Sequence, residues 1–335
     1  MSSDRDMQSN FISWVKQKAD QSQSFVDDLA DLLNVSKDSA YRRVRGETLL
    51  TFNEISKISA HYRVSLDSFL NLATNAVVFN GRQIGENFSF KNYLLSIEDH
   101  LKLVVSSPQK RMIWTAKDVP ILHYFQSPGL TRFKLFFWQK TILNTTFKEL
   151  DKYDPNSVDQ ELISIAKSIW HLYCKIPSYE IWSDETLNIT LRQIEYYYEC
   201  NLISKEVALN LTQEFIDIIR HLKGLAAIGR KYPMGGEDYP DNGAYHLFYN
   251  EIAIGDNTIF FQIGEKKVVF LTYNMLNILT TMDDAFCNET DQYLQNIIQK
   301  STPLSVSSEK ERNKFFRTME GKISLMHDRI SMTAS

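Results

Sequence analysis

Residues 24–70 read SFVDDLADLLNVSKDSAYRRVRGETLLTFNEISKISAHYRVSLDSFL, and the interpretation of the N-terminal part of the chain depends on this stretch. Apolar side chains at helical spacing predict a short helix over residues 25–33. A tight turn of two residues follows. Ser36 is then a good N-cap for a second helix, because its hydroxyl can accept a hydrogen bond from an unpaired backbone N–H, and Gly46 ends that helix. The pattern predicts two short helices joined by a brief turn.

The second of these helices, residues 36–45, combines a small apolar face with a basic outer face. Only Ala40 and Val44, four residues apart, are expected to point inward. From Lys37 to Arg45 the chain has four basic residues and one acidic residue, a local balance of +3. The first 75 residues hold nine basic and ten acidic residues, a balance of −1. Positive charge is therefore concentrated on one helix, which favours specific groove binding and predicts weak non-specific affinity for DNA.

Further helices are expected on both sides of this pair. An apolar pattern from Phe11 to Ala19 predicts a preceding helix that covers the bundle. Ser24 and Asp27 form a capping pair for the helix at 25–33, and Thr51 with Glu54 forms a capping box for the next helix. A fourth helix begins after residue 65. These elements make a four- or five-helix domain.

This organisation resembles the lambda-repressor/Cro type of helix–turn–helix, also called the XRE type. The resemblance covers about a fifth of the chain. It implies that the helix at 36–45 is a recognition helix that lies in the major groove of double-stranded DNA. The residues that carry the resemblance are Leu29–Ser36, Ala40, Val44–Gly46, Ile55, Ile58 and Val64–Phe69.

The resemblance places the base-facing positions at Lys37, Asp38 and Tyr41. Lysine can donate to guanine, aspartate can accept from cytosine, and tyrosine can contact a thymine methyl group or a phosphate. An alternative for Asp38 is that it only stabilises the positive N-terminus of the helix. At least one flanking arginine is expected to contact phosphate. The predicted DNA-binding residues are Ser36, Lys37, Asp38, Ser39, Tyr41, Arg42, Arg43, Arg45 and Thr48.

One feature departs from the family pattern. Many members carry a glutamine at the start of the helix before the recognition helix, where it contacts phosphate and braces the reading residue. Here residues 25–28 read FVDD, so only Gln23 or Ser24 could replace it. The sequence therefore predicts an interface without the usual glutamine clamp, which depends more on Arg42–Arg45 and on a partner subunit.

The rest of the chain predicts a larger, mainly helical domain with a small β component. We expect a DNA-binding domain at 1–75, a linker at 76–90 and an α+β domain at 91–330. A strand is expected at 112–116. The β component is expected to include a three-stranded antiparallel meander. Its predicted strands are residues 246–254, 258–263 and 267–272. Helices predicted around it include 91–105, 274–281, 289–300 and a last helix from Ser308.

No catalytic, cofactor or metal motif accompanies this pattern, and the sequence predicts a protein that is not an enzyme and needs no cofactor. His171 and Cys174 are three residues apart on a predicted helix, but two ligands do not make a metal site. Three cysteines without a C-x-x-C pair indicate a reduced chain with buried thiols. Residues 1–10 lack an apolar signal region, and no apolar run reaches the length of a membrane span. We therefore expect a cytoplasmic protein without membrane partners.

Segments beyond residue 80 also resemble a group of helix–turn–helix regulators from Bacteroidota-like bacteria. These segments include DVPILHYFQSP at 118–128 and EIWSDETLNITLRQIEYYYE at 180–199. The two resemblances together imply a transcriptional regulator that binds DNA as a homodimer. The larger domain would dimerise, sense an unknown effector, or do both. The alternative is a protein-interaction module, an antitoxin- or defence-like partner that carries a helix–turn–helix domain.

Overall fold

The computed structural model divides the chain into two compact units, residues 1–78 and 79–335. It describes residues 4–16, 19, 24–62, 64–70, 77–81, 88–142, 152–237, 239–252, 255–273 and 278–332.

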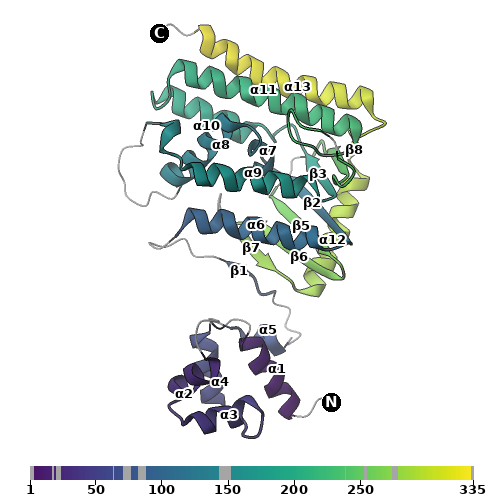
Figure 1. The fold of residues 1–335 in the computed structure, drawn as a ribbon. Coiled ribbons are helices and arrows are strands. Elements are labelled where there is room, and N and C mark those ends of the chain that lie inside the picture. Colours follow the sequence, from purple (N-terminus) through teal and green to yellow (C-terminus); the bar gives the residue numbers. More distant parts are fainter. Residues whose placement is uncertain are drawn as a thin grey trace. The chain divides into compact units, whose positions relative to one another are not determined.

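In the described residues of the smaller unit, all regular secondary structure is helical (Figure 1). Its apolar side chains meet in one core that draws on the first, second and fourth helices. The helices are α1 (Asp4–Lys16), α2 (Phe25–Leu33), α3 (Lys37–Val44), α4 (Phe52–His61) and α5 (Leu66–Leu70). The buried core residues are Phe11, Ile12, Val15, Phe25, Leu29, Leu33, Ile58 and Val64.

Local capping explains where several of these helices begin. The Ser36 hydroxyl accepts a hydrogen bond from the Ser39 N–H, and Thr51 with Glu54 forms a complete capping box at α4, so both predictions are confirmed. The predicted cap at Ser24 is wrong, because the Ser24 side chain makes no capping hydrogen bond. Its expected partner Asp27 is engaged elsewhere, in an ion pair with Lys37.

The larger unit combines long helices with a sheet. Its helices are α6 (Phe90–Ser106), α7 (Ile121–Tyr124), α8 (Pro128–Phe137), α9 (Gln160–Cys174), α10 (Asn188–Glu199), α11 (Lys205–Ile228), α12 (Asp284–Gln299) and α13 (Glu309–Met332). Short helical turns occupy Trp138–Ile142 and Pro155–Ser157. Its strands are β1 (Asn80–Gly81), β2 (Lys110–Ala116), β3 (Ser178–Trp182), β4 (Tyr245–Tyr249), β5 (Thr258–Ile263), β6 (Lys266–Thr272), β7 (Ile278–Thr281) and β8 (Thr302–Pro303).

Within the described residues, the eight strands form one mixed sheet in the order β1-β7-β6-β5-β2-β3-β4-β8. β2, β3 and β4 are parallel neighbours, and the other pairs are antiparallel. The predicted three-stranded meander is therefore wrong. β5 and β6 do form the expected hairpin, but β4 pairs with β3 and β8, and the strands β2 and β3 separate it from β5. The mainly helical character with a minor β component is confirmed.

The two faces of the sheet have separate cores. Alternate residues of β2 divide between them: Met112 and Trp114 join the main core beneath α6 to α11 and α13, whereas Ile113 lies in a second core under α12. Figure 1 shows α11 and α13 side by side along the top of this unit. None of the helices in the described ranges is long and apolar enough to cross a membrane.

Three further predictions differ from the structure. The helix predicted at 274–281 is wrong in its second half, because residues 278–281 form β7; residues 274–277 lie outside the described part. Residues 80–81, in the expected linker, pair with β7 as strand β1. The thiols of Cys174 and Cys287 are buried as expected, but Cys200 is exposed, because it follows the last residue of α10 at the surface.

Candidate nucleic-acid interface

A turn of three residues changes the direction of the chain between α2 and α3. Asn34 adopts the left-handed conformation with φ 54° and ψ 51°, which asparagine tolerates better than most residues. The Val35 N–H then donates to the Ala30 carbonyl at 3.0 Å and satisfies the end of α2. Ser36, the last residue of the turn, caps α3 with its hydroxyl 3.3 Å from the Ser39 nitrogen. The turn is therefore closed by local hydrogen bonds at both of its ends.

α3 has one narrow face against the core. Ala40 is fully buried and Val44 packs against the apolar core of the unit. The opposite face is exposed to solvent. Its exposed side chains are Ser36, Lys37, Asp38, Tyr41, Arg42 and Arg45. The remaining predicted contacts, Ser39, Arg43 and Thr48, are partly buried. Six of the nine predicted residues thus share one accessible surface.

Arg43 is directed towards α4 rather than outward. Its Nε and Nη2 atoms lie 3.0 and 2.8 Å from the same Glu54 oxygen, Oε1, and Nη1 donates to the Ser39 carbonyl at 3.1 Å. Burial on its own would raise the pKa of Glu54. Hydrogen bonds from the Thr51 N–H and from Arg43 outweigh burial and hold that pKa below its usual range. Arg43 therefore braces α3 against α4.

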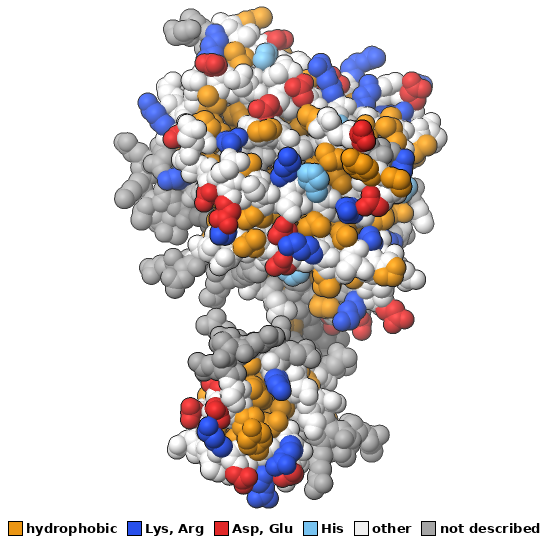
Figure 2. Space-filling view, in the orientation of Figure 1, with side chains coloured by type: hydrophobic (Ala, Val, Ile, Leu, Met, Phe, Trp, Pro, Cys, Tyr) orange, Lys and Arg blue, Asp and Glu red, His pale blue; other side chains and the backbone are white. Residues whose placement is uncertain are grey.

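Acidic neighbours accompany the exposed basic residues. Lys37 Nζ lies 3.0 Å from Asp27, and a hydrogen bond with this carboxylate raises the lysine pKa. Arg42 and Arg45 lie 3.9 and 3.3 Å from the carboxylate of Glu47. Figure 2 shows Lys and Arg side chains beside Asp and Glu side chains around this unit. These exposed pairs are weak and exchangeable, so they moderate the positive charge of α3 without removing it.

The absence of the family's glutamine clamp stays a prediction, but another glutamine, Gln8, holds the backbone at the end of α3. Gln23 lies outside the described residues, and Ser24 makes no side-chain cap. Gln8 on α1 instead reaches the backbone at the end of α3 and just beyond it. Its side-chain NH₂ group donates to the Arg43 and Thr48 carbonyls, and its side-chain oxygen accepts from the Leu50 N–H.

Gln8 precedes Phe11, Ile12 and Val15 by three, four and seven residues, so it lies on the buried stripe of α1. This helical spacing is the feature of the sequence that could have identified Gln8 as a buried residue.

The larger unit contains a fully buried polar cluster around Glu180 on β3. Its carboxylate lies 2.8 Å from His123 Nε2 and accepts hydrogen bonds from Trp182 at 2.9 Å and Tyr245 at 3.1 Å. Tyr173 donates a further hydrogen bond. All five side chains are inaccessible to solvent. The cluster is therefore enclosed in the core of this unit.

Lys231 lies at the edge of this cluster and is also fully buried. Its Nζ donates to the Ile176 carbonyl and to Ser178 Oγ, and it lies 4.6 Å from the centre of the Tyr173 ring. Burial lowers the pKa of Lys231 to about 7, although the negative charge of Glu180 acts in the opposite direction.

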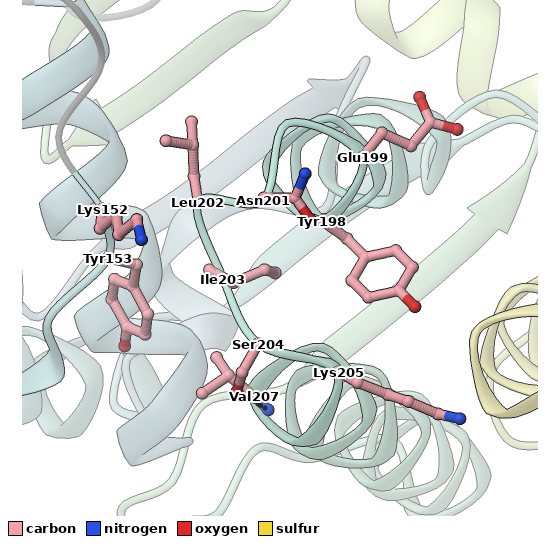
Figure 3. Close-up of a pocket in the computed structure, with 10 residues that line it drawn as sticks. All are labelled: Lys152, Tyr153, Tyr198, Glu199, Asn201, Leu202, Ile203, Ser204, Lys205 and Val207. Carbon is pink, nitrogen blue, oxygen red and sulfur yellow. Dashed lines mark hydrogen bonds between the residues drawn. The ribbon is translucent and has the colours of Figure 1, made fainter. Parts of the chain in front are cut away.

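A surface pocket of about 740 Å³ lies beside the N-terminus of α11 (Figure 3). Figure 3 shows Tyr153 and Tyr198 on opposite sides of the segment that leads into α11, with Glu199 and Lys205 pointing away from Tyr153. The polar groups do not converge on one point, as a ligand site requires. In the part of the chain that the structure describes, no group of three or more His, Cys, Asp or Glu side chains could hold a metal ion.

No family model, curated protein or solved structure shows a significant match to this chain.

Proposed function

We propose that the smaller unit is a helix–turn–helix DNA-binding domain of the lambda-repressor/Cro type and that the protein is a sequence-specific transcriptional regulator. The observation that carries this proposal is the division of α3 into two faces. Ala40 and Val44 hold one face in the core, and the other exposes polar and basic side chains. A short helix of this kind, set off from α2 by a sharp turn, fits a major groove with side chains towards base edges.

The predicted contact residues divide into two main roles. Lys37 and Tyr41, with Asp38, are proposed to contact base edges, because they occupy the first turns of α3. Arg45 and Thr48, at and beyond its C-terminal end, are proposed to contact phosphate oxygens. Ser36, Ser39 and Arg42 complete the predicted contact set at the margins of the helix. Arg43 is assigned a bracing role because its guanidinium group is paired with Glu54 and donates to the Ser39 carbonyl.

The charge balance of the interface favours selectivity over general affinity. Asp27 and Glu47 lie beside three of its basic side chains. Phosphate oxygens must compete with these carboxylates, so non-specific binding is weak and base contacts supply a larger share of the affinity.

The larger unit is proposed to dimerise the protein, to sense an effector, or to do both. One helix–turn–helix reads only a few base pairs, and a dimer on two half-sites is the usual way to gain affinity and specificity. A DNA-binding regulator of this kind would act in the cytoplasm, where bacterial DNA lies.

Selection of DNA sequences tests the proposal directly. The full-length protein is incubated with a pool of random duplexes at low salt, and bound sequences are recovered and enriched. The expected result is a short enriched motif, with a two-fold symmetric arrangement if the protein binds as a dimer. Failure to enrich any sequence would overturn the proposal.

Point variants then assign the interface. Lys37→Ala should weaken binding of the selected site by about 1–3 kcal/mol and relax the preference at one base position. Lys266→Ala, an exposed lysine in the larger unit, is the matched control and should bind like the unmodified protein. Equal losses in the two variants would argue against α3 as the reading element.

A further inference from the structure

The amide of Gln8 joins three backbone groups that lie outside its own helix. Nε2 donates to the Arg43 carbonyl at 2.8 Å and to the Thr48 carbonyl at 2.9 Å. Oε1 accepts from the Leu50 N–H at 2.8 Å. One side chain therefore ties the last turn of α3 to the segment that leads into α4.

The segment between these anchor points carries the proposed phosphate contacts. Arg45 is exposed and Thr48 is partly buried within it, and Gly46 turns the chain with φ 70°. The segment is also held by the N–H groups of Glu47 and Thr48, which donate to the Arg42 carbonyl at 2.8 and 3.3 Å. Those local bonds set the turn after α3, and Gln8 adds the connection to α1.

The position of Gln8 makes this connection specific. The residue is 9% exposed and lies on the buried stripe of α1, whose other buried residues are apolar. An amide at such a site supplies donors and an acceptor that an apolar residue lacks. Its loss would leave the Thr48 carbonyl and the Leu50 N–H without this partner in a shielded position.

We infer that Gln8 is a positioning residue for DNA binding, which fixes residues 44–50 so that Arg45 and Thr48 meet the phosphate backbone. This inference rests on the proposed function. Gln8 itself touches no DNA in this scheme, and it acts through the segment that it holds.

The test uses the full-length protein and the selected DNA site. Gln8→Met keeps the length of the side chain and removes its hydrogen bonds, and Asn10→Ala, at an exposed position of α1, is the control. Gln8→Met should weaken binding on the order of tenfold, because a phosphate contact is lost. The negative slope of log K against log salt should become less steep by about 0.9. Partial unfolding would reduce the active fraction and leave the slope unchanged.

A double-mutant cycle asks whether Gln8 acts through Arg45. Arg45→Ala should make the salt slope less steep by a similar amount. Adding Gln8→Met to this variant should then weaken binding much less than Gln8→Met does alone. Additive losses would show that Gln8 does not act through this arginine.

Gln8→Glu gives a second measure that depends on protonation. A carboxylate keeps an acceptor for the Leu50 N–H but repels the two carbonyl oxygens, whereas a protonated carboxyl can donate to one of them. Binding by Gln8→Glu should therefore recover as the pH falls, relative to the unmodified protein measured at each pH. This variant decides the question if Gln8→Met does not fold.

The outcomes separate the two proposals. If the unmodified protein selects no sequence, the proposed function fails and the role of Gln8 fails with it. If the unmodified protein binds but Gln8→Met and Gln8→Glu keep the normal salt slope and pH profile, the positioning role is wrong and the DNA-binding function stands.

Discussion

The guanidinium group of Arg43 is paired with the carboxylate of Glu54, with Nη2 2.8 Å from Oε1. Their side chains are only 16% and 15% exposed, whereas that of Arg45 is 59% exposed. Two arginines that are two residues apart on the same helical segment therefore have different surroundings. The first connects α3 to α4, and the second forms an exposed ion pair with Glu47.

The two arginines should separate stability from DNA binding. Arg43→Ala should destabilise the smaller unit by about 1–3 kcal/mol, because it leaves the shielded Glu54 carboxylate without its charged partner. Arg45→Ala should leave stability nearly unchanged and weaken binding to all sequences alike. Hydrogen–deuterium exchange of peptides from residues 25–62 measures the first effect, and filter binding measures the second. Similar loss of exchange protection in both variants would contradict the assignment.

Removing the carboxylate of Glu47 should strengthen DNA binding. Glu47 lies beside Arg42 and Arg45 and would also repel an approaching phosphate. Glu47→Gln should therefore lower the Kd several-fold at low salt, with a smaller gain at high salt because screening weakens surface charges. Glu265→Gln, at an exposed position of the larger unit, should have no effect. An unchanged Kd for Glu47→Gln would show that this face does not approach phosphate.

Glu180 should be among the most sensitive positions of the larger unit. Glu180→Ala removes the common acceptor of His123 and three further side chains, and it leaves buried polar groups without a partner. A loss of about 3–5 kcal/mol is expected, as for other broken buried pairs. Glu289→Ala, exposed on α12, is the control for thermal unfolding. A melting temperature within one or two degrees of normal would contradict this reading.

The buried lysine predicts how stability depends on pH. Burial lowers the pKa of Lys231 to about 7 in the folded protein, from an ordinary value of 10.5. Between these values the unfolded chain binds more protons, so the contribution of Lys231 to the free energy of unfolding rises as the pH increases from about 7 towards 10.5. Below about pH 7 its destabilising effect is complete.

Denaturant unfolding of the larger unit at pH 7, 8 and 9 measures this dependence. Lys231→Met should remove the rise, whatever its effect on stability at a single pH. Lys266→Ala, an exposed lysine, should retain it. If Lys231→Met shows the same pH dependence as the unmodified protein, the lysine does not titrate in this range.

The sequence by itself determined the elements that depend on neighbouring residues. The N-cap at Ser36 and the capping box at Thr51 and Glu54 involve groups within one helical turn, so they can be read along the chain. The exposed and buried faces of α3 follow from the same local period. The hairpin of β5 and β6 is also local, because a short turn joins its strands.

Tertiary structure alone decided which distant segments pair. β4 lies beside β3 rather than β5, and residues 278–281 became a strand because the edge of β6 provides their hydrogen-bond partners. Likewise, the helix predicted from Phe11 did not include Gln8, whereas α1 begins at Asp4, and nothing along the chain indicated that Gln8 would form hydrogen bonds with the backbone at Arg43 and Leu50. Helical periods and caps are set within a few residues. Strand order and shielded hydrogen bonds depend instead on which surfaces pack together, and that choice is made by the whole fold.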